Sequence, residues 1–304
     1  MSFPVMLASP PVGDAPVTPF EVEQLSLVWE GPDGTRWDLR DQAGGIVMTG
    51  DGVEGLHNPI ITKFSSKSRA VPGKRARGWR AESRDVFWPL FIWADGSNEW
   101  SERVNEFLSS IHPDRAGTWR VRARGIERTL RCTGVFTDSL PLRADPLQRG
   151  WALYPVALEA EQPYWAGEVV RRGPWAAPDP RAFFPGPPLT ISSSSAFGSA
   201  SIPNQGDVEA WGVWTLTGPL SDVVLGVGDK LIHLPFSLSA GQVLVIDTDP
   251  RRPTATLDGA NWTRQLGLQE YAAVPPGQSV PLHLEATGAG QVTFDLVPLF
   301  FRAF

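Results

Sequence analysis

Prolines and glycines interrupt the whole chain and set the tightest limit on its fold. The 304 residues include 29 Pro and 30 Gly. Pro removes a backbone donor, and Gly loses more conformational entropy than other residues when it is ordered, so both weaken long helices. Between them lie short runs in which apolar and polar residues alternate, a pattern typical of strands. The sequence therefore predicts a mainly β protein whose short strands are joined by turns.

One segment, residues 97–113, has helical rather than alternating periodicity. Its apolar residues recur at three- and four-residue spacing, and polar residues fill the opposite face. We expect Ser97 or Asn98 to cap the start of the helix and Pro113 to end it. The amphipathic helix should lie on a sheet, which it would contact through Trp100, Val104, Phe107, Leu108 and Ile111.

Several strands of the N-terminal half can be placed from their patterns. Residues 25–39 predict a hairpin that turns at Gly31–Gly34. Around Trp119, apolar residues alternate with arginines, which predicts a strand with one apolar and one basic face. The run 84–95 is apolar enough for a buried strand. Pro89 within it indicates an edge strand or a bulge, and Pro155 within the run 149–165 again indicates an edge strand.

A proline-rich segment, residues 173–188, divides the chain. Such a density of proline is incompatible with a helix or a central strand and is typical of a linker. We therefore expect an N-terminal domain over residues 1–168, a linker over 169–188 and a C-terminal domain over 189–304. The second domain has short strands at intervals of about eight to twelve residues, the pattern of an antiparallel β-sandwich.

Charge and cysteine content exclude several classes of protein. The net charge of -6 disfavours binding of nucleic acid or an anionic membrane by the surface as a whole. The single cysteine, Cys132, excludes an internal disulfide and is expected to be a small buried hydrophobic residue. No uncharged apolar stretch approaches the roughly 20 residues that span a bilayer, so no membrane insertion is expected. The first residues lack the features of a secretory signal.

No pattern in the sequence predicts catalysis. Asp247, Asp249 and Asp258 are the nearest approach to a carboxylate cluster, and we interpret them as the end of a strand and two turns, where Asp bonds its own backbone. The histidines lack the spacing of metal ligands, and they have no cysteine partner. We therefore expect no enzyme, no cofactor and no metal site. The four histidines are His57, His112, His233 and His283.

The C-terminal half carries an ordered series of short motifs. They are an Asn-x-Gly, a Gly-Pro after a strand, a Gly-x-x-hydrophobic-x-Ile-Asp-Thr strand, an Asp-Gly turn and a Pro-Gly turn. In this order they resemble the C-terminal domain of the distal tail proteins of siphovirus-type bacteriophages. The residues that carry the resemblance are Asn204, Gly206, Gly218, Pro219, Gly241, Ile246, Asp247, Thr248, Asp258, Gly259, Pro276 and Gly277.

The resemblance implies a structural protein of the virion tail tip, assembled in the host cytoplasm. Its N-terminal, strand-rich domain with one amphipathic helix would form a hexameric ring, and its C-terminal domain would be a galectin-like antiparallel β-sandwich. Implied partners are the tail tube protein, the tape-measure protein and the tail-tip or baseplate hub protein. DNA would meet the ring only in transit through its lumen.

A basic segment extends from Lys63 to Arg84, with Glu82 as its one acidic residue. Three interpretations remain open: a contact with a neighbouring subunit or another tail protein, a solvated loop, and a contact with passing DNA. In the first, the contact residues would be Lys67, Arg69, Lys74, Arg75 and Arg77.

An alternative function belongs to a different class, a carbohydrate-binding module that adheres to the host cell envelope. Trp211, Trp214 and Trp262 would then stack on the sugar rings of a surface glycan, whereas core packing is the other interpretation of these residues. Because Trp211 and Trp214 are three residues apart on one strand, they face opposite sides and only one of them can be in the core.

Overall fold

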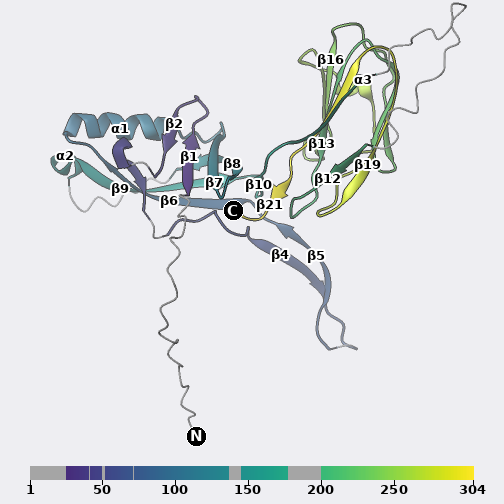
Figure 1. Ribbon diagram of the computed structural model, residues 1–304. Coiled ribbons are helices and arrows are strands. Elements are labelled where there is room, and N and C mark those ends of the chain that lie inside the picture. The colour runs from purple at the N-terminus through teal and green to yellow at the C-terminus, as the bar shows by residue number, and fades with distance from the viewer. Residues whose placement is uncertain (1–24, 41, 50–51, 71, 137–144, 177–199) are drawn as a thin grey trace, which may run out of the picture.

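The computed structural model describes residues 25–304 apart from 41, 50–51, 71, 137–144 and 177–199 (Figure 1). Antiparallel sheets dominate the described residues and enclose two separate hydrophobic cores. Among these residues, α1 (Ser97–Ser109) is the one helix of more than four residues, and no helix is long and apolar enough to cross a bilayer. The predicted fold class, mainly β with one amphipathic helix and a sandwich, is confirmed.

The N-terminal domain is built on a strongly curved sheet that runs in the order β2-β1-β7-β8-β9-β6-β3. The predicted hairpin is confirmed, with Trp29 opposite Trp37 in the β1–β2 ladder. The strands are β1 (Ser26–Glu30), β2 (Arg36–Asp38), β3 (Ile46–Met48), β6 (Arg84–Trp93), β7 (Gly117–Ala123), β8 (Ile126–Val135) and β9 (Trp151–Ala160). The short helices η1 (Gln42–Gly44) and α2 (Pro146–Arg149) precede β3 and β9.

The helix α1 covers one face of this sheet (Figure 1). Trp100, Val104 and Phe107 are buried, as the periodicity predicts. The predicted cap is wrong: the N-cap is Gly96, which has no side chain, and Ser97 is already helical, with its hydroxyl donating to the Leu147 carbonyl. That hydroxyl joins α1 to α2 instead of closing its own helix.

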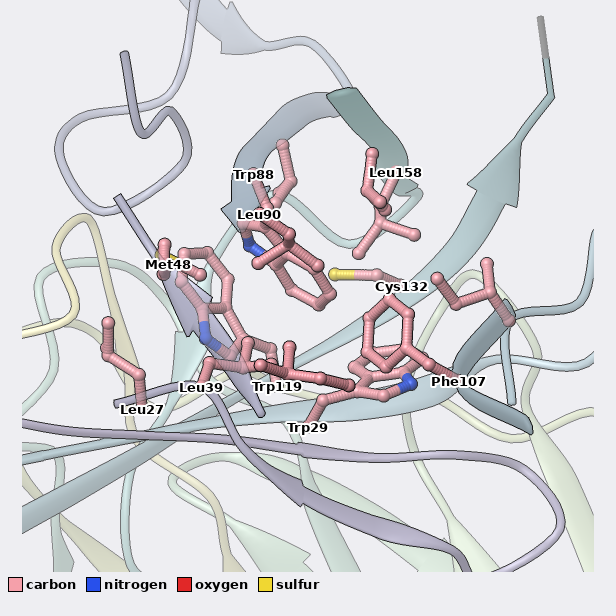
Figure 2. Close-up of a cluster of buried hydrophobic side chains, with 14 of the residues drawn as sticks. Leu27, Trp29, Leu39, Met48, Trp88, Leu90, Phe107, Trp119, Cys132 and Leu158 are labelled. Atoms are coloured by element: carbon pink, nitrogen blue, oxygen red, sulfur yellow. The ribbon is translucent and has the colours of Figure 1, made fainter. Parts of the chain in front are cut away.

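Four tryptophans form the centre of the N-terminal core, and Figure 2 shows three of them around Cys132. The ring of Trp88 makes edge contacts with Trp29 at 5.3 Å and with Trp119 at 5.2 Å between centroids. Trp165 extends the series at 5.1 Å from Trp119. Cys132 is 1% exposed, so its predicted role as a small buried hydrophobic residue is confirmed.

Pro89 and Pro155 lie directly opposite each other in the β6–β9 ladder. Both strands have neighbours on either side in the sheet order, but β9 pairs with β8 only from Ala157 to Glu159, so at Pro155 its one described partner is β6. The edge prediction is therefore wrong for Pro89, whose carbonyl is paired on its other side as well, and holds locally for Pro155. The Pro89 carbonyl accepts from the Thr49 amide at 2.8 Å, on the side away from β9. In an antiparallel strand the N–H and C=O of one residue point the same way, so this pair needs no N–H in the β6–β9 ladder.

The C-terminal domain is a sandwich of two antiparallel sheets. Trp214 and Phe294 meet in its core at 4.5 Å between ring centroids. One sheet has the order β11 (Val170–Ala176), β20 (Gln291–Leu296), β13 (Gly212–Thr217), β16 (Val243–Asp247), β17 (Thr254–Leu257) and β18 (Ala260–Asn261), and the other β12 (Ser201–Pro203), β19 (Ser279–Thr287), β14 (Ser221–Val227) and β15 (Lys230–His233). A short helix, α3 (Thr263–Leu266), follows β18.

The domain boundaries differ from those predicted. Residues 170–176, assigned to the linker, form β11 and pair with β20 inside the sandwich. At the other end, β21 (Leu299–Phe300) pairs with β10 (Trp165–Ala166), which also pairs with β8, and Ala303 is buried in the N-terminal core. The chain thus returns to its first domain after completing the sandwich. The predicted linker residues 177–188 and the start at 189 lie outside the described residues.

The Asn-x-Gly motif lies where that return begins. The Asn204 side chain is 1% exposed; its amide donates to the carbonyls of Val208 and Val274 at 2.8 Å, and its oxygen accepts from the Gly206 amide at 2.8 Å. A Cβ on Gly206 would lie 2.6 Å from the Leu299 carbonyl oxygen. Asn204 therefore fixes the loop, and Gly206 lets β21 approach it.

Candidate assembly surfaces

The basic segment forms a two-stranded arm, β4 (Ile61–Ser66) and β5 (Arg75–Ala81), which projects from the N-terminal domain (Figure 1). The two strands pair only with each other, from Ile61 opposite Ala81 to Ser66 opposite Arg75. A bulge at Arg77 shifts the register between Phe64 and Ser65. The loop interpretation is therefore wrong for β4 and β5 and applies only to the tip between Ser66 and Arg75, while the solvent exposure that it implies is present along the arm.

The five predicted contact residues lie together on the arm and its tip, and all are exposed. One of them has a side-chain partner on the arm itself, since the Arg77 Nε donates to the Ser66 hydroxyl at 3.0 Å. Nearer the base, Arg80 pairs with Glu82 at 2.9 Å. The arm therefore carries a concentrated positive charge in a protein whose net charge is negative. The exposed contact residues are Lys67, Arg69, Lys74, Arg75 and Arg77.

The arm also exposes two aromatic side chains among its charged residues. Phe64 is 47% exposed and Trp79 is 51% exposed. Trp79 makes a ring contact with Phe301 at 6.0 Å, whereas Phe64 lies opposite Gly78, which offers no side chain. An isolated two-stranded hairpin is marginally stable in water. A hairpin that is exposed on both faces therefore gains stability from whatever covers it.

A buried arginine holds the base of the arm. Arg84 is 3% exposed, and its guanidinium donates to the carbonyls of Pro163 at 2.6 Å, Gly55 at 2.7 Å and Phe301 at 2.8 Å, and also to the His57 carbonyl. Desolvation lowers the pKa of Arg84 to about 10. One side chain thus ties together the arm, the loop before it, the start of the interdomain crossing and the returning C-terminal segment.

The three tryptophans of the glycan hypothesis do not form one exposed platform. Trp214 is 0% exposed and fills the sandwich core. Trp262 is partly buried against the same core and makes an edge contact with Phe236 at 6.3 Å. Trp211 is partly exposed, as expected for the residue on the opposite side from Trp214. A sugar cannot stack on Trp214 in this structure, because its ring offers no face to solvent.

The three aspartates of the candidate carboxylate cluster lie as predicted: Asp247 ends β16, and Asp249 and Asp258 lie in the connections on either side of β17. Asp247 accepts from the amide of Asp249 at 3.0 Å, and Asp258 accepts from the amide of Val243 at 2.8 Å. Asp249 pairs with Arg251, whose hydrogen bond lowers the pKa of that carboxyl. Within the described residues, no group of three or more His, Cys, Asp or Glu side chains is placed to hold a metal ion. Burial raises the pKa of the Cys132 thiol, which lies in the core.

Two features of these surfaces were not predicted from the sequence. Arg84 was part of the basic run, but its partners are backbone carbonyls from distant segments, which leave no mark in composition. The exposed aromatic residues Phe64 and Trp79 were also not predicted, because the segment was interpreted from its cationic residues alone. Their signal was present, because large aromatic residues within a strongly charged exposed segment are typical of a protein interface.

Solved structures with a similar fold include proteins of a phage adsorption apparatus and of a phage baseplate. The SPP1 Dit protein, a paradigm of the hub adsorption apparatus in Gram-positive infecting phages, superposes with a TM-score of 0.59 at 13% identity, over 90% of this chain and 98% of that one. A chain of the phage P2 baseplate in its activated conformation with Ca matches with a TM-score of 0.50 at 11% identity, over 91% of this chain and 98% of that one. No family model and no curated protein matches the sequence. The resemblance to distal tail proteins is thereby confirmed at the level of the fold.

Proposed function

We propose that this protein is a structural component of a phage tail tip and not an enzyme. Its copies form a ring, hexameric as the motif resemblance implies, that connects the tail tube to the tip or baseplate hub. The observation that carries the proposal is the shared fold, which extends over 90% of this chain and 98% of the SPP1 Dit protein. A fold alone does not define a function, so the surfaces supply the second support.

Ring closure requires two different surfaces on each subunit that meet head to tail. The exposed, cationic arm supplies one such surface. The five cationic residues on it, Lys67, Arg69, Lys74, Arg75 and Arg77, would contact a neighbouring subunit or an adjoining tail protein. The other partners follow from a place at the tail tip: the tube protein on one side, the hub on the other, and the tape-measure protein and transiting DNA in the lumen.

The mass of the purified protein in solution tests the proposal. Light scattering behind a sizing column should give a mass close to six times 33.2 kDa, with ring-shaped particles in negative stain. Reversal of the arm charges in Lys74→Glu/Arg75→Glu/Arg77→Glu should weaken the ring. A matched control reverses three exposed charges of the sandwich, at Lys230, Arg252 and Arg264. A monomer at every concentration tested, or equal masses for the arm and sandwich variants, would count against this function for the arm.

A further inference from the structure

The strand β6 is apolar on both of its faces; within the part of the chain that the structure describes, one face is buried and the other is only partly buried. Its even-numbered residues from Val86 to Ile92 are buried in the N-terminal core. The residues between them point to the other side of the sheet, because side chains alternate along a strand. These outward residues are also apolar, and they are Phe87, Pro89, Phe91 and Trp93.

The neighbouring strand β9 continues this second apolar surface. Its outward residues stand directly opposite those of β6, since Phe91 pairs with Leu153 and Trp93 with Trp151. Leu153 is 55% exposed and Trp151 is 38% exposed. The ring of Phe91 contacts those of Trp93 at 5.3 Å and Trp151 at 5.5 Å between centroids. The outward residues of β9 are Trp151, Leu153, Pro155 and Ala157.

These eight residues form what we call the outer face, a surface unusual for a soluble monomer. A sheet whose strands are apolar on both sides is normally covered on both sides. Contiguous exposed apolar patches, unlike single exposed residues, mark sites of interaction. On β8 the outer face is extended by Val135, which is opposite Ala157 and 45% exposed.

One end of the outer face is acidic. Asp85 and Glu159 are directly opposite each other in the β6–β9 ladder, on the same side of the sheet as the apolar residues. Like charges in opposed positions destabilise a sheet unless something neutralises them. Among the described residues, neither carboxylate has an ion-pair partner. A partner for this surface should therefore carry apolar side chains and positive charge together.

The arm has that composition. It presents Phe64 and Trp79 among the cations of its strands and tip, and it is itself uncovered. Figure 1 shows that the arm leaves the domain near the start of β6 and points away from the body of the sheet, so it does not cover the outer face of its own chain. We propose that the outer face of β6 and β9 receives the β4–β5 arm of a second copy of this chain, with the arm cations against Asp85 and Glu159. This inference rests on the proposed self-assembly and names the two surfaces that would meet.

Cross-linking between two differently marked copies tests the contact. Two variants with one introduced cysteine each, Phe64→Cys on the arm and Leu153→Cys on the outer face, are co-expressed and treated with a flexible bismaleimide. Cys132 does not compete, because it is 1% exposed. The control partner is Leu268→Cys, a fully exposed position on the sandwich. We expect the Phe64→Cys/Leu153→Cys product to exceed the Phe64→Cys/Leu268→Cys product by about tenfold or more, since a docked arm raises the effective concentration.

The outcomes separate this contact from the proposed function. An assembled protein in which Leu153→Cys cross-links no better than Leu268→Cys would overturn the contact and leave the ring proposal intact. A protein that is monomeric by light scattering at every concentration would overturn both.

A charge exchange provides the second measurement. Asp85→Lys/Glu159→Lys should weaken association by about tenfold, as expected for a few exposed ion pairs. Combination with the arm reversal Lys74→Glu/Arg75→Glu/Arg77→Glu should then restore assembly, because the charges become complementary again. If the combined variant assembles no better than either reversal alone, the arm cations do not meet these two carboxylates.

Discussion

The two domains of this protein differ in how they close their surfaces. The described part of the sandwich exposes one large hydrophobic side chain between residues 200 and 298, Leu268. The N-terminal domain with its arm and the returning C-terminal segment exposes ten, and Val169 between the two domains is exposed as well. The ten are Ile60, Phe64, Trp79, Ile126, Val135, Phe136, Leu147, Trp151, Leu153 and Phe304. The sandwich has buried its apolar surface within itself, whereas the N-terminal domain has apolar surface left for a partner.

The difference between the domains is not in how their hydrophobic cores are built. Both are built around large aromatic residues that are fully buried, Trp88 and Trp119 in one and Trp214 and Phe294 in the other. Both also bury indole N–H groups that have no hydrogen-bond partner, including those of Trp88 and Trp214. What distinguishes the domains is the outside of their sheets. Folding and assembly should therefore respond to different substitutions.

The largest expected effect is on the sandwich core. Trp214→Ala removes a fully buried indole and should lower the free energy of unfolding of the sandwich by about 3–5 kcal/mol. Urea denaturation monitored by circular dichroism measures this change. Trp211→Ala, at the partly exposed position of the same segment, is the matched control and should cost much less. Equal losses at both positions would contradict the assignment of Trp214 to the core.

The next effect concerns the point at which the two domains meet. Arg84→Met leaves four backbone carbonyls without their donor and should destabilise the protein by about 2–4 kcal/mol. Native-state hydrogen exchange should show the amides of 299–304 losing protection first. Arg80→Met, an exposed arginine on the arm, serves as the control and should leave that protection unchanged.

A smaller effect is expected from the outer face. Leu153→Ala should change the free energy of unfolding of the isolated chain by less than about 0.5 kcal/mol, because its side chain is 55% exposed. Leu216→Ala, the same substitution at a position that is 0% exposed in the sandwich, should cost about 2–5 kcal/mol. Thermal or urea unfolding of the pair tests the comparison, and similar costs would show that Leu153 is already covered within one chain.

The smallest expected effect is at Cys132, for which no labelling of the native protein is expected. Cys132 should not be labelled by a thiol reagent in the native protein, because burial both blocks access and raises the pKa of the thiol, which disfavours the reactive thiolate. Labelling in denaturant should go to completion. Since this cysteine lies in the N-terminal core, its labelling rate in intermediate urea reports the opening of that core separately from the sandwich. Rapid labelling of the native protein would contradict the burial.

Local patterns predicted the elements but not their neighbours. Alternation around Trp119 and the helical spacing around Trp100 placed a strand and a helix, and both faces came out as expected. Pro89 was misread because it was judged alone: its register opposite Pro155 makes a pair that needs no N–H in the β6–β9 ladder, which β6 by itself does not reveal. Likewise, the apolar run of β6 predicted a buried strand, but no pattern within one chain distinguishes a side covered by the core from one left for a partner.

The predictions of the arm and of the domain boundaries were wrong for a related reason, because both depend on features that local alternation does not show. The arm is polar on both faces along most of its length, so the alternation that identifies strands is missing. Residues 170–176 contain a proline and lie at the start of the proline-rich segment, yet they pair with β20, which lies more than a hundred residues later. Such pairing depends on contacts between distant segments, which a reading along the sequence does not reveal.

The return of residues 299–303 to the first domain has a consequence for synthesis. A chain emerging from the ribosome offers the N-terminal strands first, but β10 lacks its β21 partner, and Arg84 its Phe301 carbonyl, until residue 301 has been made. The sandwich strands are complete by Leu296. The domain that is translated first is therefore the one whose last strand pairing and last Arg84 hydrogen bond form only after the sandwich strands have been made.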